Sequence, residues 1–222
     1  MTEQPKNKNK PLKQLAYECI KEKILSCEYK PGLYLNEQQV CADIGGISRT
    51  PVRDALGRLE QEGLLNILPK KGVIISELQI YDINRIYEVR MLLEPYALSR
   101  YGNKLNPEEF NRFALIMSSQ DPIQTANFYE LDDRFHGFIM SAIPNPYLMD
   151  TYENISNMNQ RLRVLSGSLV KNRIADTFAE HMVIIDSCLE QKWDKAAGDM
   201  TAHLEKSRIA TFKMIAENKD NF

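Results

Sequence analysis

Apolar side chains in the N-terminal part of the chain recur at steps of three and four residues, the spacing of one buried helix face. This spacing predicts three helices, over residues 12–27, 36–43 and 49–62. Turn residues separate them: Pro31-Gly32 follows the first helix and Gly45-Gly46 follows the second. Gly63 is the residue expected to end the third helix.

Two short apolar runs follow the third helix and flank a basic turn. Residues 64–68 and 73–76 have the composition of β-strands, and Pro69-Lys70-Lys71-Gly72 lies between them. Leu33-Tyr34-Leu35 is predicted to be a short extended piece. Three helices followed by a β-hairpin with lysines at its tip predict a winged helix-turn-helix domain over residues 12–76.

The third predicted helix carries two arginines and a hydroxyl at its N-terminal end. Ser48 occupies the N-cap position, and Pro51 lies in the first turn, where a missing N–H costs nothing. Arg49, Thr50 and Arg53 project away from the apolar stripe. Because arginine can donate two parallel hydrogen bonds to guanine, we interpret this helix as a DNA recognition helix. The alternative is an ordinary amphipathic surface helix with solvated arginines.

Beyond a short link at residues 77–80, the hydrophobic periods are helical throughout. They predict six helices: one contains residues 83–97, two begin at Asn106-Pro107 and after Asp121-Pro122, and three span about 147–165, 174–191 and 194–217. Long helices with short connections are typical of an antiparallel bundle. The expected fold class is mainly α, with the winged helix-turn-helix joined to an all-α antiparallel helical bundle over residues 77–222.

Charge differs between the two parts of the chain. Residues 1–76 carry 12 Lys and Arg against 9 Asp and Glu, whereas residues 77–222 carry 16 against 21. A basic N-terminal part on an acidic remainder fits a nucleic-acid module attached to a domain with another task. At 43 % hydrophobic and 26 % charged residues, the chain has the composition of a globular protein with a real core.

The N-terminus and the cysteines suggest where the protein works. Residues 1–11 are polar and lysine-bearing, which predicts a disordered arm and not a secretion signal. No apolar run approaches the roughly 18 residues that span a membrane. The four cysteines show no CxxC spacing and lie in apolar patterns, as small core residues do in a reducing cytoplasm. We therefore expect a cytoplasmic protein with no membrane partner.

Three histidines each lie in the middle of a different predicted helix, within an apolar pattern. Asp132 precedes His136 by four residues, so both side chains leave the same face of one helix. With His181 and His203 from facing helices, they form a set that can chelate one ion. Imidazole plus carboxylate suits zinc, nickel, iron or manganese better than calcium. Two alternatives stay open: the histidines fill the core without a metal, or Asp133 replaces Asp132.

Spaced motif pieces in residues 12–76 resemble the DNA-binding domain of GntR-family transcription regulators. They are Pro31-Gly32, Leu35-x-Glu37, Ser48-Arg49-Thr50-Pro51-Val52-Arg53-Asp54-Ala55-Leu56, Leu59-x-x-Glu62-Gly63-Leu64 and Pro69-x-x-Gly72. The resemblance implies a double-stranded operator DNA partner, with contacts from Ser48, Arg49, Thr50 and Arg53 and from the wing residues Lys71 and Gly72. The chain departs from the usual pattern by one extra residue in the turn between Val40 and Ser48.

Sparser motifs over residues 80–215 resemble the FCD effector domain, the helical C-terminal half of FadR-subfamily GntR regulators. They are Asp132-x-x-Phe135-His136, Glu180-His181 with Ile184 and Cys188 following, and His203-Leu204. In metal-binding members the ligands are an aspartate and three histidines, which implies Asp132, His136, His181 and His203. Those members bind small organic acids against the metal, and the occupied state changes DNA affinity. Zinc is the ion expected.

A carboxylate effector also needs a cationic partner, and the planar fork of arginine pairs well with it. Arg90, within Glu88-Val89-Arg90-x-x-Leu93-Glu94, matches an arginine of the family pattern, and Arg161 is a second candidate. The alternative for Arg90 is a salt bridge to Glu94, four residues further along the helix.

Together these observations predict a metabolite-responsive transcription regulator. A homodimer is expected, because one recognition helix reads few base pairs and two-fold symmetry doubles the contacts. Repression is the commoner outcome in the family that the chain resembles, so a repressor is expected. The alternative from another class is a metal-dependent hydrolase or lyase, because His/Asp sites with open coordination positions catalyse hydrolysis. No nucleophile motif accompanies the cluster.

Overall fold

The computed structural model of the 222-residue chain describes residues 10–119, 128–166 and 171–217. The chain divides into two compact units, Met1–Leu78 and Gln79–Phe222, close to the boundary expected at residue 77. Most of the arm expected at residues 1–11 lies outside the described residues, and the first helix begins at Leu12.

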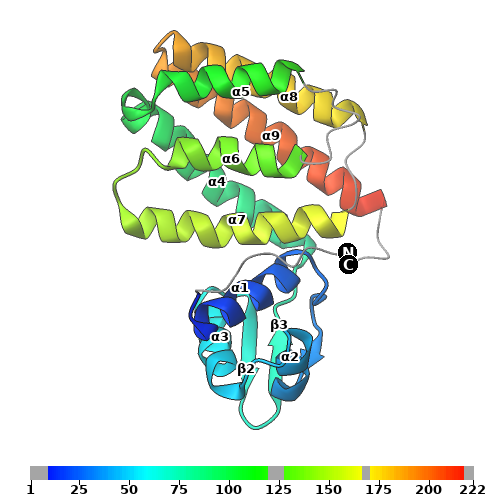
Figure 1. The fold of residues 1–222 in the computed structure, drawn as a ribbon. Coiled ribbons are helices and arrows are strands. Elements are labelled where there is room, and N and C mark those ends of the chain that lie inside the picture. The colour runs from blue at the N-terminus through cyan, green and yellow to red at the C-terminus, as the bar shows by residue number, and fades with distance from the viewer. Residues whose placement is uncertain (1–9, 120–127, 167–170, 218–222) are drawn as a thin grey trace. The chain divides into compact units, whose positions relative to one another are not determined.

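The N-terminal unit contains three helices and three short strands (Figure 1). They are α1 (Leu12–Leu25), β1 (Tyr34–Leu35), α2 (Glu37–Asp43), α3 (Arg49–Gln61), β2 (Leu65–Leu68) and β3 (Gly72–Ile75). Helix α1 packs against α3, and their buried side chains include Ala16, Ile20, Ile24, Val52, Ala55, Leu56 and Leu59. The predicted winged helix-turn-helix is therefore confirmed.

Two glycines shape the turn between α2 and α3, the turn in which one extra residue is expected from the sequence. A capping box starts α2: Asn36 Oδ1 accepts from the Gln39 N–H at 2.8 Å, and the Gln39 side chain accepts from the Asn36 N–H at 3.1 Å. After α2, Gly45 and Gly46 have φ of 82° and 77°. Two successive glycines in this left-handed region reverse the chain without the steric cost that a side chain adds.

Ser48 precedes α3 as expected, but its side chain makes no capping hydrogen bond. A serine at this position usually accepts from the N–H of the second or third helical residue. Here the third helical residue is Pro51, which has no N–H to donate. Ser48 thus occupies the N-cap position as predicted, but its side chain makes no capping bond and its exposed hydroxyl lies at the tip of α3.

The predicted hairpin is part of a three-stranded antiparallel sheet in the order β1-β3-β2. The extended piece expected at Leu33–Leu35 supplies the third strand, with Tyr34 opposite Ile74 of β3. Gly72 lies where β3 meets β1, with φ of 136°, and a β-carbon there would overlap the carbonyl oxygen of Leu35. Only glycine lets the two backbones approach this closely at the turn end of the hairpin.

The second unit is helical in all of its described segments. Its elements are α4 (Ile80–Tyr101), the 3₁₀ turn η1 (Gly102–Lys104), α5 (Pro107–Ser119), α6 (Phe128–Met140), α7 (Pro146–Ser166), α8 (Lys171–Leu189) and α9 (Trp193–Glu217). The helix start expected after Asp121-Pro122 lies outside the described residues. The six predicted helices therefore correspond to α4–α9.

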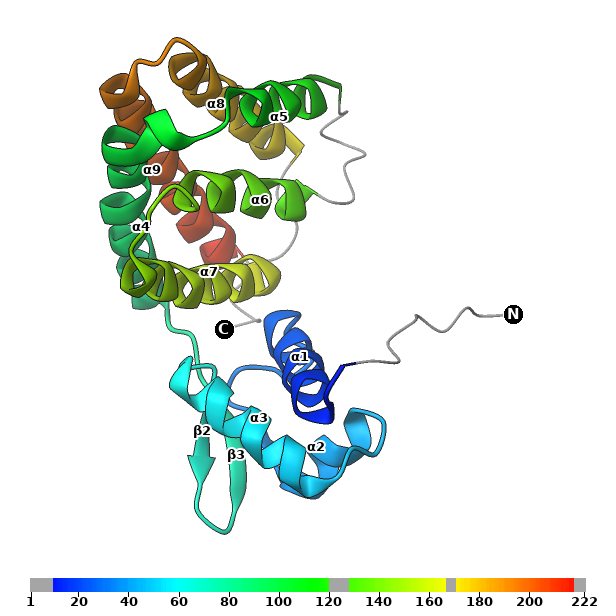
Figure 2. The ribbon, with the colours of Figure 1, turned by 60° about the vertical axis from the view of Figure 1, so that its left-hand side comes forward.

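Helix α6 occupies the middle of this unit, between α5 and α7, while α4 packs along α9 (Figures 1 and 2).

Edge-to-face ring contacts hold α6 against α5: the Phe113 and Phe135 ring centroids are 5.4 Å apart, and those of Phe110 and Phe138 are 5.1 Å apart. These contacts fix the rotation of α6, and with it the directions of Asp132 and the other polar side chains on its inner face.

None of the described helices is both long enough and apolar enough to cross a lipid bilayer. None of the four cysteines forms a disulfide in the described residues. Cys188 is buried as predicted, but Cys19, Cys27 and Cys41 are only half-buried, so the expectation that all four are core residues is wrong.

Gly102 offers a direct test of packing in the helical unit. A β-carbon at this position would overlap the indole ring of Trp193. We expect Gly102→Ala to lower the free energy of unfolding by about 1–3 kcal/mol, because the core must shift to admit a methyl group. Denaturant unfolding followed by tryptophan fluorescence measures this, since Trp193 is the only tryptophan.

Gly198→Ala is the matched control, because its β-carbon would meet open space in the interior of α9. It should leave stability unchanged or raise it by up to about 1 kcal/mol, the helix propensity gained over glycine. If both variants have the stability of the wild type, the packing described around Trp193 is wrong.

Candidate functional site

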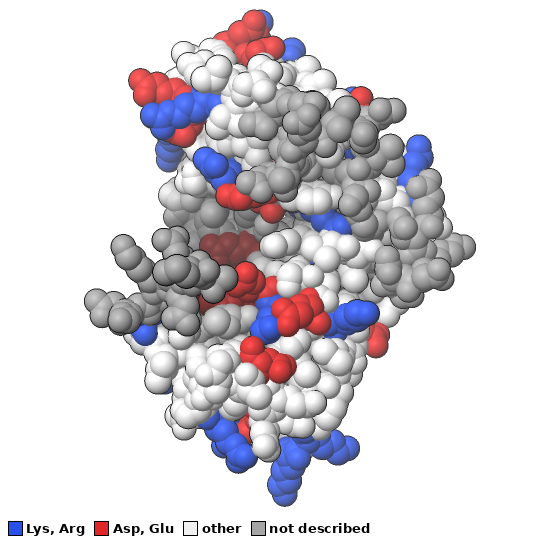
Figure 3. Space-filling view, turned by 45° about the vertical axis from the view of Figure 1, so that its right-hand side comes forward, with Lys and Arg blue, Asp and Glu red and all other residues white. Residues whose placement is uncertain are grey.

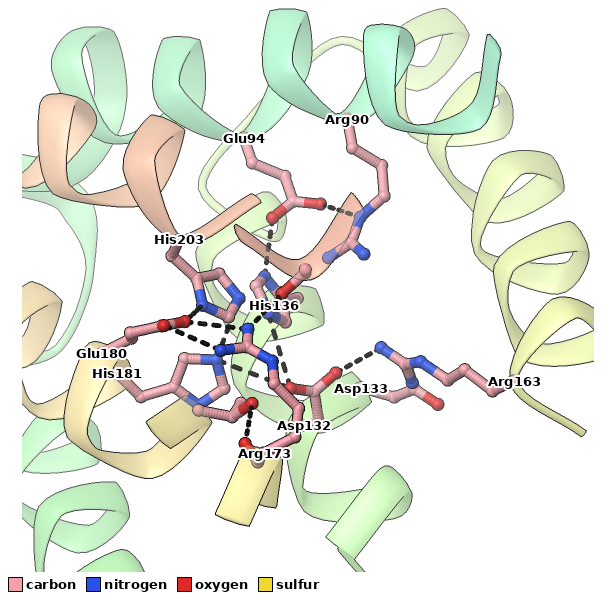
Figure 4. A network of polar contacts seen from close by, with 12 residues as sticks. Arg90, Glu94, Asp132, Asp133, His136, Arg163, Arg173, Glu180, His181 and His203 are labelled. Carbon is pink, nitrogen blue, oxygen red and sulfur yellow. Dashed lines mark hydrogen bonds and ion pairs between the residues drawn. The ribbon is translucent and has the colours of Figure 1, made fainter. Parts of the chain in front are cut away.

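Four side chains from three helices meet in the interior of the helical unit (Figure 4). Asp132 and His136 lie one turn apart on α6, His181 comes from α8 and His203 from α9, and all four are buried. Nε2 of His181 lies 3.3 Å from Nε2 of His203 and 3.5 Å from Oδ1 of Asp132. Nε2 of His136 lies 3.8 Å from the same oxygen. The structure therefore brings the four expected metal ligands together.

Two glutamates determine which nitrogen of two imidazoles faces this cluster. Glu94 Oε2 lies 2.6 Å from His136 Nδ1, and Glu180 Oε2 lies 2.8 Å from His203 Nδ1. An ionised carboxylate can only accept, so each Nδ1 carries a proton, and in the neutral imidazole the lone pair is then on Nε2. Carboxylates that accept from the distal imidazole nitrogen orient histidines in many metal sites.

The imidazole nitrogens directed into the cluster make few hydrogen bonds within the protein. His136 Nε2 is buried and makes no hydrogen bond, and the Nε2 atoms of His181 and His203 face one another. A zinc–nitrogen distance of about 2.0–2.1 Å places neighbouring tetrahedral ligand atoms about 3.4 Å apart. Three of the six separations, 3.3, 3.5 and 3.8 Å, lie near that value, and all four atoms lie within 4.8 Å of one another. A cation among the four atoms satisfies all of these lone pairs together.

The environment sets the protonation states that metal binding requires. Burial lowers the pKa of His181 well below its ordinary value, and nearby His203 lowers it further. Burial also lowers the pKa of His203, against the opposing hydrogen bond to Glu180. Burial by itself raises the pKa of Asp132, but Arg163 and the imidazoles lower it more, so the net shift is downward. Two neutral imidazoles and an ionised carboxylate therefore face each other at pH 7.

Arginines hold both glutamates in place. Arg90 Nε donates to Glu94 Oε1 at 2.7 Å, so the salt bridge considered from the sequence is present. Arg173 donates through both ends of its fork to Glu180, at 2.8 and 3.0 Å. Although burial by itself raises the pKa of Glu94, Arg90 and His136 more than offset this effect, and the pKa falls to about 2. Two chains of contacts, each arginine–glutamate–histidine, thus end at the same cluster.

Arg163 on α7 serves the two aspartates. It donates to Asp132 and, at 2.6 Å, to Asp133, which the sequence had left as the alternative ligand. Arg161, the effector contact expected from the sequence, is fully buried and lies 3.7 Å from the sulfur of Met158. Side chains two positions apart on a helix point about 200° away from one another, so Arg161 and Arg163 cannot face the same side of α7.

A small cavity of about 40 Å³ adjoins the cluster. Its wall includes Asp132 and His203, and it also includes the guanidinium groups of Arg90, Arg163 and Arg173. Arg161 does not line it. The cavity thus combines a cationic wall with access to two cluster residues, which is an environment for an anion.

The sequence pattern predicted the cluster but not the residues around it. Glu94 was considered only as a partner of Arg90, although its buried place on the inner face of α4 makes it the acceptor for His136. Arg163 and Arg173 were not proposed. Such arginines can be found in a sequence by their spacing, because they lie one or two helical turns from an acidic residue predicted to face the core. Arg173, two turns before Glu180 on α8, is an example.

A second candidate site is a groove in the N-terminal unit, between α2, the start of α3 and the wing. The wall contains the predicted DNA contacts Arg49, Arg53, Lys71 and Gly72, together with Lys70. Ser48 and Thr50 are exposed at the start of α3. In the space-filling view, Lys and Arg side chains gather at the tip of the unit, where the β2–β3 turn lies (Figure 3).

Arg53 is positioned in this groove by an acid. Its Nε donates to both carboxylate oxygens of Glu37 on α2, at 2.8 and 2.9 Å. Because the contact uses Nε, the two terminal nitrogens of the guanidinium group are not needed to hold it. An arginine fixed in this way can present its outer edge to a nucleic acid.

Comparison with known proteins covers both units. Residues 12–75 match the gntR family of bacterial regulatory proteins, and residues 85–206 match the FCD domain. The HTH-type transcriptional repressor RspR of Escherichia coli K12 is 25 % identical over 220 residues, which are 97 % of this chain and 96 % of RspR. The gluconate operon transcriptional repressor of Bacillus subtilis is 26 % identical over 178 residues, 78 % of this chain and 71 % of that protein.

Solved structures share the fold. Escherichia coli McbR/YncC superposes with a TM-score of 0.77 at 16 % identity, covering 92 % of this chain and 99 % of that one. A GntR transcriptional regulator from Rhodococcus sp. RHA1 gives a TM-score of 0.73 at 15 % identity, covering 90 % and 97 %.

Glu94 tests the network around the cluster. Glu94→Ala leaves the buried Arg90 guanidinium without its carboxylate, and we expect a loss of about 3–5 kcal/mol in the free energy of unfolding. The exposed Glu88, on the same helix, is the control: Glu88→Ala should change stability by no more than about 0.5 kcal/mol. Denaturant unfolding measures both, and a Glu94→Ala variant as stable as the control contradicts the assignment.

Proposed function

Because the chain belongs to the GntR family of bacterial transcription regulators and carries an FCD domain, we propose that a carboxylate bound beside a metal ion in the helical unit controls how the winged unit binds operator DNA. The relatives are transcription regulators, and the alternative of a hydrolase or lyase gains no support from them. The observation that carries the proposal is the convergence of Asp132, His136, His181 and His203 beside a cavity with an arginine wall.

Zinc is the ion that we propose for the cluster. Three imidazole nitrogens and one carboxylate oxygen form a donor set that zinc accepts, and that nickel, iron and manganese also accept. When bound, the ion supplies positive charge and coordination positions for an oxygen ligand. The protein side chains do the rest: Glu94 and Glu180 orient two imidazoles, and Arg163 holds Asp132.

A small carboxylate is the effector that fits the cavity. Arg90 and Arg173 line it while pairing with Glu94 and Glu180 through only part of their donor sets. A guanidinium group has five N–H donors, so each arginine can bind a carboxylate and keep its glutamate. Arg161, which the sequence also suggested, is replaced in this proposal by Arg163 and Arg173.

Operator DNA binding is assigned to the groove of the N-terminal unit. We propose that Arg49, Thr50 and Arg53 meet base edges and phosphates in the major groove, with Ser48 at the helix tip beside a phosphate. Lys71 and Gly72 at the tip of the wing approach the backbone or the minor groove of the DNA. Such a protein works where the chromosome is, in the cytoplasm.

A homodimer and repression complete the proposal. Two copies related by a two-fold axis read the two halves of a palindromic site, which one recognition helix cannot do. RspR and the gluconate operon regulator are both named repressors, which favours repression here. The effector acts only if it binds one arrangement of the DNA-binding units better than the other.

Adjacent aspartates provide a test of the metal site. We expect the wild type, purified without chelators or a metal-affinity tag, to hold about one zinc ion per chain. Asp132→Asn removes a ligand and should weaken zinc binding more than about 100-fold, since even orienting residues around a metal cost 10–100-fold. Elemental analysis and titration against a coloured zinc chelator measure occupancy and affinity.

Asp133→Asn is the matched control, because Asp133 shares Arg163 with Asp132 but lies outside the cluster. Its zinc affinity should stay within about threefold of the wild type, as no ligand is lost. Equal losses in both variants, or less than about one ion per two wild-type chains, contradict the proposed site.

Variants of Arg49 and Lys71 distinguish sequence-specific DNA binding from non-specific electrostatic binding. With DNA selected by the wild type from a random library, Arg49→Gln should reduce discrimination against a scrambled sequence by about 1–3 kcal/mol. Lys71→Gln should lower the affinity for both DNA sequences by the same factor. It should also reduce the slope of log affinity against log salt concentration by about one. Fluorescence anisotropy titrations at several salt concentrations measure both effects.

Lys30→Gln is the control for charge, because Lys30 is exposed on the same unit but does not line the groove. Its affinity for either DNA should change by no more than about twofold, since distant exposed charges are screened by salt. A uniform loss of affinity in Arg49→Gln, without loss of discrimination, argues against base reading by this residue.

A further inference from the structure

Three consecutive polar side chains at the start of α2 line the groove of the N-terminal unit: Asn36, Glu37 and Gln38. Asn36 Oδ1 accepts from the N–H of Gln39, and both carboxylate oxygens of Glu37 accept from Arg53. Gln38 is exposed, and its amide makes no hydrogen bond with any of the described residues. Of the three, Gln38 is therefore the one whose whole amide is available to a ligand in the groove.

The charged side chains around Gln38 in this groove are mostly cationic. Arg49, Arg53, Lys70 and Lys71 line it as well, and charges of this sign supply the attraction to the phosphates of a nucleic acid. A neutral amide adds little to that attraction, because it neutralises no phosphate. What it adds is an acceptor and two donors in one plane. Gln38 is therefore better suited to recognising a base than to holding the DNA backbone.

Adenine is the base whose major-groove edge matches a glutamine amide. Its N7 accepts and its N6 donates, so the amide nitrogen and oxygen of glutamine pair with both atoms at once. Guanine presents two acceptors, N7 and O6, on the same edge. These suit the parallel N–H groups of an arginine such as Arg49, but they leave the oxygen of a glutamine facing an acceptor.

We propose that Gln38 is a second base-reading residue, which selects an adenine in the same half-site in which Arg49 selects a guanine. This inference rests on the operator-binding function proposed above, and it adds a side chain of α2 to the contacts made by α3 and the wing. Because Gln38 and Arg49 line one groove from different helices, they reach different base pairs of the site.

The base preference at every position of one DNA site provides the test. The reference is a duplex selected from a random library by the full-length wild type, and each of its base pairs is changed in turn to the alternatives. Competition titrations followed by fluorescence anisotropy give the relative affinities. We expect the wild type to prefer adenine at one position of the half-site by at least about fivefold, the lower end of what a bidentate pair contributes.

Gln38→Ala should reduce this adenine preference to less than about twofold, because alanine cannot form the bidentate pair. The guanine preference that is lost in Arg49→Gln should be kept in Gln38→Ala, since the two residues read different base pairs. Gln38 is exposed, so we expect the variant to fold as the wild type does.

Gln38→Arg is the sharper variant, because arginine pairs with N7 and O6 of guanine. It should change the preferred base at the same position from adenine to guanine, a change that a merely structural role of Gln38 does not produce. Gln61→Ala is the matched control, because Gln61 is an exposed glutamine at the end of α3 that does not line the groove. Its base preferences should equal those of the wild type.

The outcomes separate this inference from the function on which it rests. An adenine preference that persists in Gln38→Ala or in Gln38→Arg, or a selected site without such a preference, overturns the role of Gln38 and leaves operator binding intact. An equal loss of affinity for every duplex in Gln38→Ala also overturns it, because that result identifies a phosphate contact. If the wild type selects no sequence from the library, operator binding and this inference are both wrong.

Discussion

The helical unit depends on one buried and one partly buried ion pair, each of which orients an imidazole of the cluster. Arg90 pairs with Glu94 and Arg173 with Glu180, and each glutamate holds one histidine of the cluster. A charge removed from water is tolerated only when its partner is fixed and its remaining hydrogen bonds are made. The contacts that orient these histidines are therefore also needed for the stability of the unit, so the cluster is preorganised in the absence of a ligand.

Two carboxylates of this network, those of Asp132 and Asp133, share a single arginine. Arg163 pairs with both. In the function that we propose, a divalent cation beside Asp132 balances the remaining negative charge and attracts an anion to the cavity. In the same proposal, the ion and the effector contact side chains of α4, α6, α8 and α9, and α4 begins at Ile80, directly after the N-terminal unit.

Features of the sequence that act within one element were predictable. The helical period of three to four residues located α1–α9, and the four-residue step from Asp132 to His136 placed both on one face, because a helix fixes the directions of its own side chains. The winged helix-turn-helix followed in the same way. Pro51, the third residue of α3, also removes one of the two N–H donors that the Ser48 side chain could use.

Contacts between elements were decided only by the tertiary structure. The sequence alone left open whether His181 faces His203, whether Asp132 or Asp133 joins them, and which arginine lines the cavity. A periodic pattern shows that a side chain is buried, but the rotation and offset of one helix against another depend on how the whole core packs. That is why Arg161 and Arg163 look equivalent in the sequence, while only Arg163 reaches the cluster.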